Sequence, residues 1–298
     1  MKVLGEEELL SLMKAHRIRY VGGVEKRVAE AFRGEAGVGG VLITSLGLYM
    51  DQIPPKVTLV SRLARTDAPY TVTWADSVSL SGDDAPGILG LGLVNSVKEL
   101  MPRALDRLAD SLAAHLLSEK PQTPDRRAGA RYRPRGFYRS PIMNEGKSNS
   151  VAVLPFVNQS ARRYAGELIG LKVIEQLRKS EGFEVLEPGI VRDELLKFRI
   201  ISPEGASLAD ADILFDQIKA DLLFTGKVMD YDDTRGSGGA PNVTFFVQVI
   251  ERRSRQVVWA SHSTNRGNDG VFFFGAGKVT TADALASKMM ADVVQRIR

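Results

Sequence analysis

Three groups of closely spaced carboxylates have the clearest potential for chemistry in this chain. They are Asp83 and Asp84, then Asp210, Asp212 and Asp216, then Asp230, Asp232 and Asp233. Carboxylates at short range are the usual groups for general acid–base catalysis. Asp212 and Asp216 lie one turn apart on a predicted helix that also needs its apolar face, which indicates a solvated face. Asp230 and its neighbours stand where a predicted strand enters a turn, and there aspartate is common for local hydrogen bonding.

Histidine, cysteine and serine form no better constellation. The histidines, His16, His115 and His262, are far apart in the sequence, and none has a neighbour at a metal-ligand spacing. The chain contains no cysteine, which excludes disulfides, thiolate metal sites and a cysteine nucleophile. No serine stands in a GxSxG elbow with a histidine following in triad order. We therefore expect a protein that is not an enzyme, with no metal, no cofactor and no small-molecule substrate.

Two glycine-rich stretches, residues 82–92 and 267–278, precede predicted helices. Backbone amides at the start of a helix can hold phosphate. The second stretch lacks the GxxxxGK[ST] spacing, and neither follows the first strand of a βαβ unit, as a dinucleotide-binding fingerprint does. The pattern favours connections with glycines at helix starts, so a nucleotide-binding enzyme is the weakest of our three functional hypotheses.

Aromatic residues give a further candidate site. Phe272, Phe273 and Phe274 form a run inside the second glycine-flanked stretch, where three aromatic side chains are hard to bury together. Binding of a partner and packing beneath a sheet are equal interpretations of this run. Trp74 and Trp259 stand at the same point of two similar segments, and a tryptophan repeated in this way is typical of core packing.

The basic character of the chain is concentrated in residues 119–148. This segment has eight basic and three acidic residues, a net charge of +5, whereas the whole chain has a net charge of +4. Its arginines are interleaved with aromatic residues, a pattern that can bind nucleic acid or anionic lipid. The arginines concerned are Arg126, Arg127, Arg131, Arg133 and Arg135. Because polar residues and prolines are frequent, we interpret the segment first as a solvated linker and second as a polyanion-binding site.

Two copies of one domain surround this linker. The chain has 298 residues, 44% of them hydrophobic and 26% charged, which suits two globular domains. A shift of 185 residues carries Trp74 to Trp259 and Gly82 to Gly267, with no gap from residue 72 to residue 92. Upstream the likeness continues at a slightly different offset, from residues 42–44 to residues 223–225. A repeat of this length indicates a domain duplication, with copies at 1–118 and 149–298.

The second copy shows the whole unit. Its hydrophobic pattern predicts a mixed α/β (α+β) fold, one mixed sheet with helices packed against it. We expect the order β-α-β-α-α-β-β-β-α. The expected strands are 150–156, 183–186, 220–230, 243–251 and 256–264, and the expected helices are 161–179, 191–198, 208–218 and 281–297.

The first copy starts late. Its predicted strand Lys2–Leu4 corresponds to Glu184–Leu186, so the apolar first strand and the long helix of the unit have no counterpart. Loss of such a strand leaves apolar surface and unpaired backbone groups. We expect either that Met1 is not the natural start, or that another chain or an unusual pairing fills the gap. The first copy is then expected to be the less stable half.

Four motifs in order give the second copy a family resemblance. They are residues 151–158 (VAVLPFVN), 183–186 (FEVL), 219–228 (KADLLFTGKV) and 257–261 (VVWAS). With this order and spacing the second copy resembles the CsgG / LpoB / TolB N-terminal superfamily of bacterial envelope proteins, and the first copy resembles it more weakly. The resemblance implies a periplasmic or outer-membrane-associated protein, commonly a lipoprotein, that works by protein contact rather than by catalysis.

The chain departs from this family in several respects. Members that form pores add long membrane-spanning hairpins, and the predicted connections 232–241 and 252–255 are too short to supply them. The lipid-acceptor cysteine is missing, no apolar run has the length of a membrane-spanning helix, and the early acidic run, Glu6–Glu8, is not typical of a signal peptide. Our first hypothesis is an envelope accessory or scaffold protein that binds envelope proteins, with homo-oligomers possible. Polyanion binding by the basic segment is the alternative.

Overall fold

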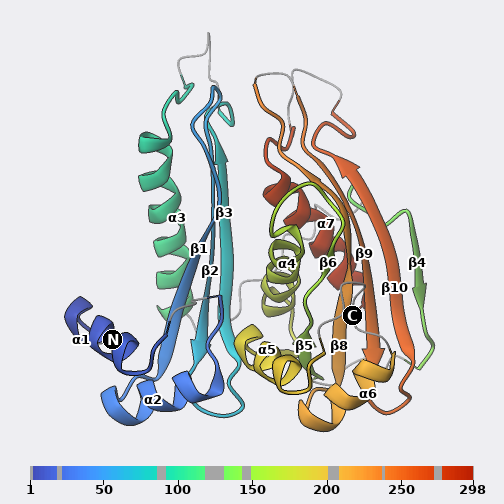
Figure 1. Cartoon of the computed structure of the whole chain (residues 1–298). Coiled ribbons are helices and arrows are strands. Elements are labelled where there is room, and N and C mark those ends of the chain that lie inside the picture. The colour runs from blue at the N-terminus through green and yellow to red at the C-terminus, as the bar shows by residue number, and fades with distance from the viewer. Residues whose placement is uncertain are drawn as a thin grey trace.

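The computed structural model describes residues 3–18, 22–85, 92–117, 131–142, 149–200, 208–236, 239–271 and 277–297. Its strands form two open sheets, one of three strands in the first copy and one of seven strands in the second (Figure 1). Helices pack against both sheets, so the predicted mixed α/β class is confirmed.

The first copy consists of two short helices, three antiparallel strands and one long helix. The elements are α1 (Glu6–Ala15), α2 (Lys26–Ala36), β1 (Gly40–Met50), β2 (Lys56–Arg65), β3 (Val72–Ser81) and α3 (Val97–Leu117). The sheet order is β1-β2-β3. Leu100, Ala104 and Leu108 recur at helical spacing on α3 and pack on the sheet, where they share a core with Trp74.

The second copy has the predicted order of elements, with two short strands added. Its elements are β4 (Gly136–Arg139), β5 (Asn149–Val153), β6 (Val157–Asn158), α4 (Ala165–Lys179), β7 (Phe183–Val185), α5 (Pro188–Lys197), α6 (Leu208–Gln217), β8 (Leu222–Asp232), β9 (Asn242–Glu251), β10 (Val257–Arg266) and α7 (Ala282–Ile297). The sheet order is β4-β10-β9-β8-β5-β7, and β6 pairs with β8. β5 runs parallel to β7 and β8, whereas β4, β8, β9 and β10 are antiparallel to their neighbours in this group.

One predicted boundary is wrong by four residues, because the helix expected from residue 161 begins at Ala165. The side chain of Asn158 organises the chain before it. Its Oδ1 accepts a hydrogen bond from Ser160 N at 3.0 Å, and its Nδ2 donates one to Arg162 O at 2.7 Å. The residue before the helix, Tyr164, has a φ of 64°, which breaks the helical path at that point.

The two copies repeat each other element by element. An offset of 182 residues carries α1, α2 and β1 onto α5, α6 and β8, and an offset of 185 residues carries β3 and the start of α3 onto β10 and α7. The bulge between Leu46 and Leu48 recurs between Val228 and Asp230. The offset of 182 makes Leu42 equivalent to Phe224, so the sequence comparison of 42–44 with 223–225 is one residue out of register.

Local hydrogen bonds repeat as well. Gly82 N donates to Pro55 O at 2.8 Å, and Gly267 N donates to Pro241 O at 2.9 Å. A Cβ at either glycine would collide with a backbone carbonyl, so both positions require glycine. This explains why the glycine spacing is the sharpest part of the repeat in the sequence.

The start of the first copy differs from the expectation. Lys2 lies outside the described residues, and Val3 and Leu4 belong to no strand. The edge of the first sheet that corresponds to the position of β5 is formed by β1 instead. In the second sheet β5 lies beside β8, whereas β1, the equivalent of β8, pairs only with β2 among the described residues.

Part of the predicted linker belongs to the second sheet. β4 pairs with the edge of β10, and Tyr132 is buried. The ring of Phe137 stacks on Trp259 with centroids 5.2 Å apart. The interpretation as a solvated linker is therefore wrong for residues 131–140, because the aromatic residues between the arginines attach the segment to the sheet. The rest of the predicted linker, residues 118–130 and 143–148, lies outside the described residues.

The first sheet packs against helices of the second copy. α3 covers one face of the first sheet, and the opposite face meets α4 and α7, which also cover the second sheet (Figure 1). Val60, Val72 and Ala75 of the first sheet therefore share one core with α4, α7 and the second sheet. On the far face of the second sheet, α5 and α6 pack through a separate apolar cluster. The largest core spans both copies, so the two copies are not independent in the structure.

Candidate functional site

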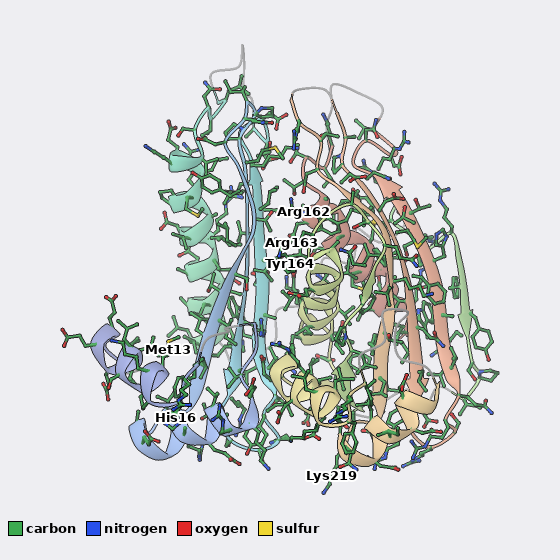
Figure 2. The ribbon with its side chains drawn as sticks, viewed as in Figure 1. Met13, His16, Arg162, Arg163, Tyr164 and Lys219 are labelled. Atoms are coloured by element: carbon green, nitrogen blue, oxygen red, sulfur yellow. The ribbon has the colours of Figure 1, made fainter. Side chains whose placement is uncertain are left out.

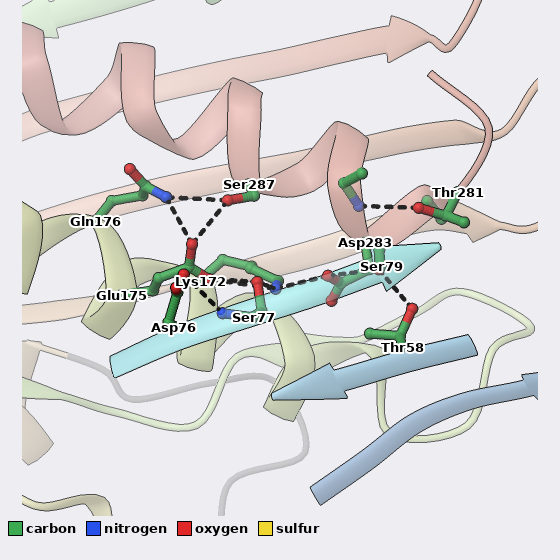
Figure 3. A network of polar contacts seen from close by, with 12 residues as sticks. Thr58, Asp76, Ser77, Ser79, Lys172, Glu175, Gln176, Thr281, Asp283 and Ser287 are labelled. Atoms are coloured by element: carbon green, nitrogen blue, oxygen red, sulfur yellow. Dashed lines mark hydrogen bonds and ion pairs between the residues drawn. The ribbon is translucent and has the colours of Figure 1, made fainter. Parts of the chain in front are cut away.

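A cluster of charged residues is buried where β3 meets α4 and α7 (Figure 3). Lys172 on α4 is fully buried, with its Nζ 2.7 Å from Asp283 Oδ2 on α7 and 3.3 Å from Glu175 Oε2. The Ser77 hydroxyl on β3 accepts a hydrogen bond from Lys172 Nζ at 2.5 Å and donates one to Glu175 Oε2 at 2.7 Å. The cluster therefore joins the first sheet to the two central helices.

Further polar contacts enclose this cluster. Lys179 Nζ lies 2.7 Å from Asp76 Oδ1 on β3 and 2.8 Å from Glu175 Oε1. The Ser79 hydroxyl donates to Asp283 Oδ2 at 3.0 Å. On the other side, Gln176 Nε2 donates to the Ser287 hydroxyl at 2.9 Å. Each carboxylate of the cluster thus meets donors from both copies or from both helices.

The charges in the cluster stabilise one another. Burial alone would lower the pKa of Lys172, but Asp283 and Glu175 raise it above its usual value. Burial would also raise the pKa of Glu175, but Lys172 and Lys179 lower it to about 2. Lys172 and Glu175 therefore stay ionised near neutral pH, and both pKa values lie far from the neutral range in which a general acid or base is most effective. This arrangement suits a structural connection between the copies rather than proton transfer.

A second buried ion pair joins the copies at another point. Arg62 Nη2 on β2 lies 2.9 Å from Glu187 Oε1, next to the start of α5. Glu187 also accepts a hydrogen bond from Val24 N at 3.1 Å and donates its own N–H to Tyr70 O at 2.9 Å. At the start of α4, Arg162 Nη2 donates to Gly47 O on β1 at 2.7 Å (Figure 2).

The carboxylate groups noted in the sequence have structural contacts. Asp84 Oδ2 accepts a hydrogen bond from Ser81 N at 2.7 Å, and Asp233 Oδ1 accepts one from Ala282 N at 2.7 Å, at the start of α7. Burial raises the pKa of Asp233. Asp212 and Asp216 are exposed and lie 3.3 and 3.1 Å from Arg255, which confirms the predicted solvated face.

The histidine nearest the N-terminus also has a structural contact. His16 Nε2 lies 2.7 Å from Glu35 Oε1 and links α1 to α2 (Figure 2). Among the described residues, no three histidine, aspartate or glutamate side chains converge as a metal-ligand set.

The structure gives the predicted site residues different places. Phe272, Phe273, Phe274, Arg126 and Arg127 lie outside the described residues. The Arg131 guanidinium donates to Gly277 O at 2.8 Å and to Gly267 O at 3.4 Å, which holds the ends of the second glycine-rich stretch together. Arg133 and Arg135 are exposed.

An apolar surface stands beside the open edge of the first sheet. It consists of Leu42, Leu46 and Tyr49 on β1 and Leu105 on α3, and we call it the β1–α3 strip. These side chains are 48%, 55%, 54% and 48% exposed. The equivalent residues of the second copy are Phe224, Val228, Tyr231 and Met290, and each is at most 1% exposed. In the second copy these residues lie in the core formed with α4, and none of the described helices of the first copy corresponds to α4.

Sequence reasoning missed both the charged cluster and the strip. The signal for the cluster was present in α4, where apolar residues on several sides of the helix alternate with Lys172, Glu175 and Gln176. A helix that is apolar on all sides is buried on all sides, and its charged residues are then buried with it. The signal for the strip was the missing strand and helix of the first copy. The sequence alignment of the two copies was wrong by one residue in this region, so it did not identify the side chains that become exposed.

Known families and curated proteins give no match to this sequence: no family model matches, and no curated protein matches. None of the described helices is long and apolar enough to cross a membrane.

Several solved structures match part of this chain at low sequence identity. The PelC dodecamer from Paraburkholderia phytofirmans is 18% identical, with a TM-score of 0.38, over 54% of this chain and 94% of that chain. Lipoprotein GNA1162 from Neisseria meningitidis is 18% identical, with a TM-score of 0.33, over 50% of this chain and 95% of that chain. The LpoB C-terminal domain from Salmonella enterica is 11% identical, with a TM-score of 0.30, over 40% of this chain and 83% of that chain.

Proposed function

We propose that this protein is a non-enzymatic accessory or scaffold protein of the bacterial cell envelope that works by binding another protein. The observation that carries the proposal is the β1–α3 strip. An exposed apolar surface beside an open sheet edge is typical of a protein-binding site. The buried charged residues of the junction, in contrast, are engaged in holding the two copies together.

The proposed location in the cell envelope rests on the sequence motifs. The fold gives a physical reason why some of these motif residues occur together. Phe156 of the VAVLPFVN motif packs directly over Gly226 of the KADLLFTGKV motif, so a Cβ at Gly226 would collide with its ring. A Cβ at Gly166, near the start of α4, would collide with the Phe156 carbonyl. Two of the four motifs therefore pack directly on each other, which supports reading them together as one signal of resemblance to periplasmic and outer-membrane-associated proteins.

Site-specific cross-linking tests this proposal. A photoreactive amino acid replaces Leu46 in the full-length protein, which is expressed in the bacterium that encodes it. A matched variant carries the same group at Leu196, an exposed leucine of α5. We expect envelope proteins to be cross-linked from position 46 and not from position 196. Equal cross-linking from both positions, or adducts with cytosolic proteins only, would contradict the proposal.

Polyanion binding is the second candidate function. The observation in its favour is that Arg133, Arg135 and the ring of Tyr138 are all exposed within one short segment, so both cations and an aromatic ring are accessible there. The guanidinium of Arg131 already donates to two backbone carbonyls, so we expect Arg131 to contribute less to polyanion binding than Arg133 and Arg135.

A further inference from the structure

The second copy shows what a covered β1–α3 strip looks like. There β5 pairs with the edge of β8 in parallel, from Val151 opposite Leu222 to Val153 opposite Phe224. The chain then crosses into α4, whose apolar side chains share a core with Phe224, Val228 and Tyr231. A strand of 5 residues and a helix of 15 residues are thus the cover of this place in the fold.

The edge of β1 is suited to receive such a strand. Its sequence from Gly40 to Met50, GVLITSLGLYM, contains no charged residue and no proline. Natural edge strands usually carry such residues, which prevent pairing with another strand. Residues 40–42 are the equivalents of Leu222–Phe224, the part of β8 that pairs with β5.

We propose that the β1 edge and the β1–α3 strip bind a strand–helix segment of a partner protein. The strand pairs in parallel with residues 40–42, and the amphipathic helix that follows lies beside α3 over Leu42, Leu46 and Tyr49. This inference rests on the proposed function, because it names the kind of partner that the strip binds.

One substitution between the copies predicts the charge of the partner helix. In the second copy Lys172 of α4 lies 2.7 Å from Asp283 of α7. The equivalent of Asp283 on α3, at the offset of 185 residues, is Lys98, and its side chain is exposed. A partner helix with a lysine at the position of Lys172 would meet a like charge, so the partner carries an acidic residue there.

A second copy of this chain is the competing occupant. Antiparallel pairing of β1 with β1 of another molecule would extend the sheet, but β1 supplies no helix to cover the strip. A strand–helix segment covers both the edge and the strip, and for this reason it is the occupant that we propose.

Two synthetic peptides with the full-length protein test the inference. One has the sequence of residues 149–181, and the other is the same peptide with Lys172→Glu. We expect both to protect the amides of residues 40–46 from hydrogen exchange. The Lys172→Glu peptide is expected to bind roughly fivefold more tightly, because it replaces a like-charge contact at an exposed site by an ion pair.

Two variants of the protein locate the binding. Leu46→Lys is expected to weaken peptide binding at least about tenfold, because the peptide would bury an unpaired ammonium group. Leu196→Lys is the matched control and should bind as the unmodified protein does. The inference is overturned if neither peptide protects residues 40–46, or if Leu46→Lys binds the peptides unchanged. Protection of the same amides without peptide, together with a dimer in sedimentation, would overturn it in favour of a second copy.

These results separate the inference from the proposed function. Cross-linking of envelope proteins from position 46, with no protection by either peptide, would leave the function standing and reject the strand–helix partner. Peptide binding without any cross-linked envelope protein would support the strand–helix partner and reject the proposed envelope function.

Discussion

Arg62 on β2 and Glu187 at the start of α5 form an ion pair of 2.9 Å that joins the two copies. Their side chains are 3% and 1% exposed, so water stabilises neither charge. Glu187 is held further by the backbone N–H of Val24. Because each charge depends on the other, loss of one leaves a buried charge without compensation.

Arg62→Leu is therefore expected to lower the free energy of unfolding by about 3–5 kcal/mol, measured by urea denaturation. Arg65→Leu is the matched control, because Arg65 pairs with Asp67 at the surface, where such a pair contributes about 0–1 kcal/mol. If both variants lose the same small amount, the pair at the junction has no special role.

The charged cluster predicts how stability depends on acid. The pKa of Glu175 is about 2 in the folded protein, against an ordinary value of 4.5. Its stabilising contribution is therefore complete above pH 4.5 and is lost as the pH falls from 4.5 through 2. The shift corresponds to a loss of about 3 kcal/mol in the free energy of unfolding.

Urea denaturation at pH 6 and at pH 3 measures the part of this loss that occurs above pH 3, about 2 kcal/mol for these two pKa values. In Glu175→Gln the difference between the two pH values should be smaller than in the unmodified protein, because the titrating carboxyl is absent. Equal pH dependence in the two proteins would show that other carboxylates cause the acid sensitivity. Asp110→Asn removes an exposed carboxyl of α3 and is the matched control. Its free energy of unfolding should change between pH 6 and pH 3 by as much as that of the unmodified protein.

Much of the second copy could be predicted from its sequence, because its strands and helices have distinct hydrophobic periods. The short strand β4 was missed, since Gly136–Arg139 is only four residues long and follows a run of arginines and a proline; Phe137 of this strand stacks on the core residue Trp259. The strand expected at Lys2–Leu4 was inferred from similarity to Glu184–Leu186 alone. In the second copy residues 183–185 form a strand by pairing with β5, and no described strand of the first copy takes that place beside residues 3–4.

The packing of the first sheet on α4 could not be predicted from the pattern of either copy alone. The pattern of β3 looks half polar, with Ser77 and Ser79 facing away from Trp74. Those serines are half-buried, and Lys172, Glu175 and Asp283 of the other copy contact them. Sequence reasoning treats charged residues as solvated, so a polar interface between a sheet and the helices of another copy is the kind of feature that it misses.

The basic segment gives a prediction that separates binding from stability. Arg133→Gln with Arg135→Gln is expected to weaken binding to single-stranded nucleic acid or anionic vesicles and to flatten its salt dependence, if the segment binds polyanions. The same pair should leave the melting temperature nearly unchanged, because both side chains are exposed. Arg131→Gln should instead lower the melting temperature, because the Gly277 and Gly267 carbonyls lose their donor. Absence of binding by the unmodified protein at low salt would reject the polyanion hypothesis.

The shared core predicts that the two copies stay together after the chain between them is cut. A protease site placed within residues 121–128 allows cleavage there without touching the described residues. The pieces should still elute as one particle in gel filtration, because α4 buries apolar side chains against both sheets and the ion pairs Arg62–Glu187 and Lys179–Asp76 cross the junction. They should separate only in urea, in one transition with the loss of helix signal. The same cut in Arg62→Leu is expected to release the pieces at a lower urea concentration. Separation of the unmodified pieces in buffer, or two independent transitions, would show that each copy is stable by itself and that the junction is a weak contact.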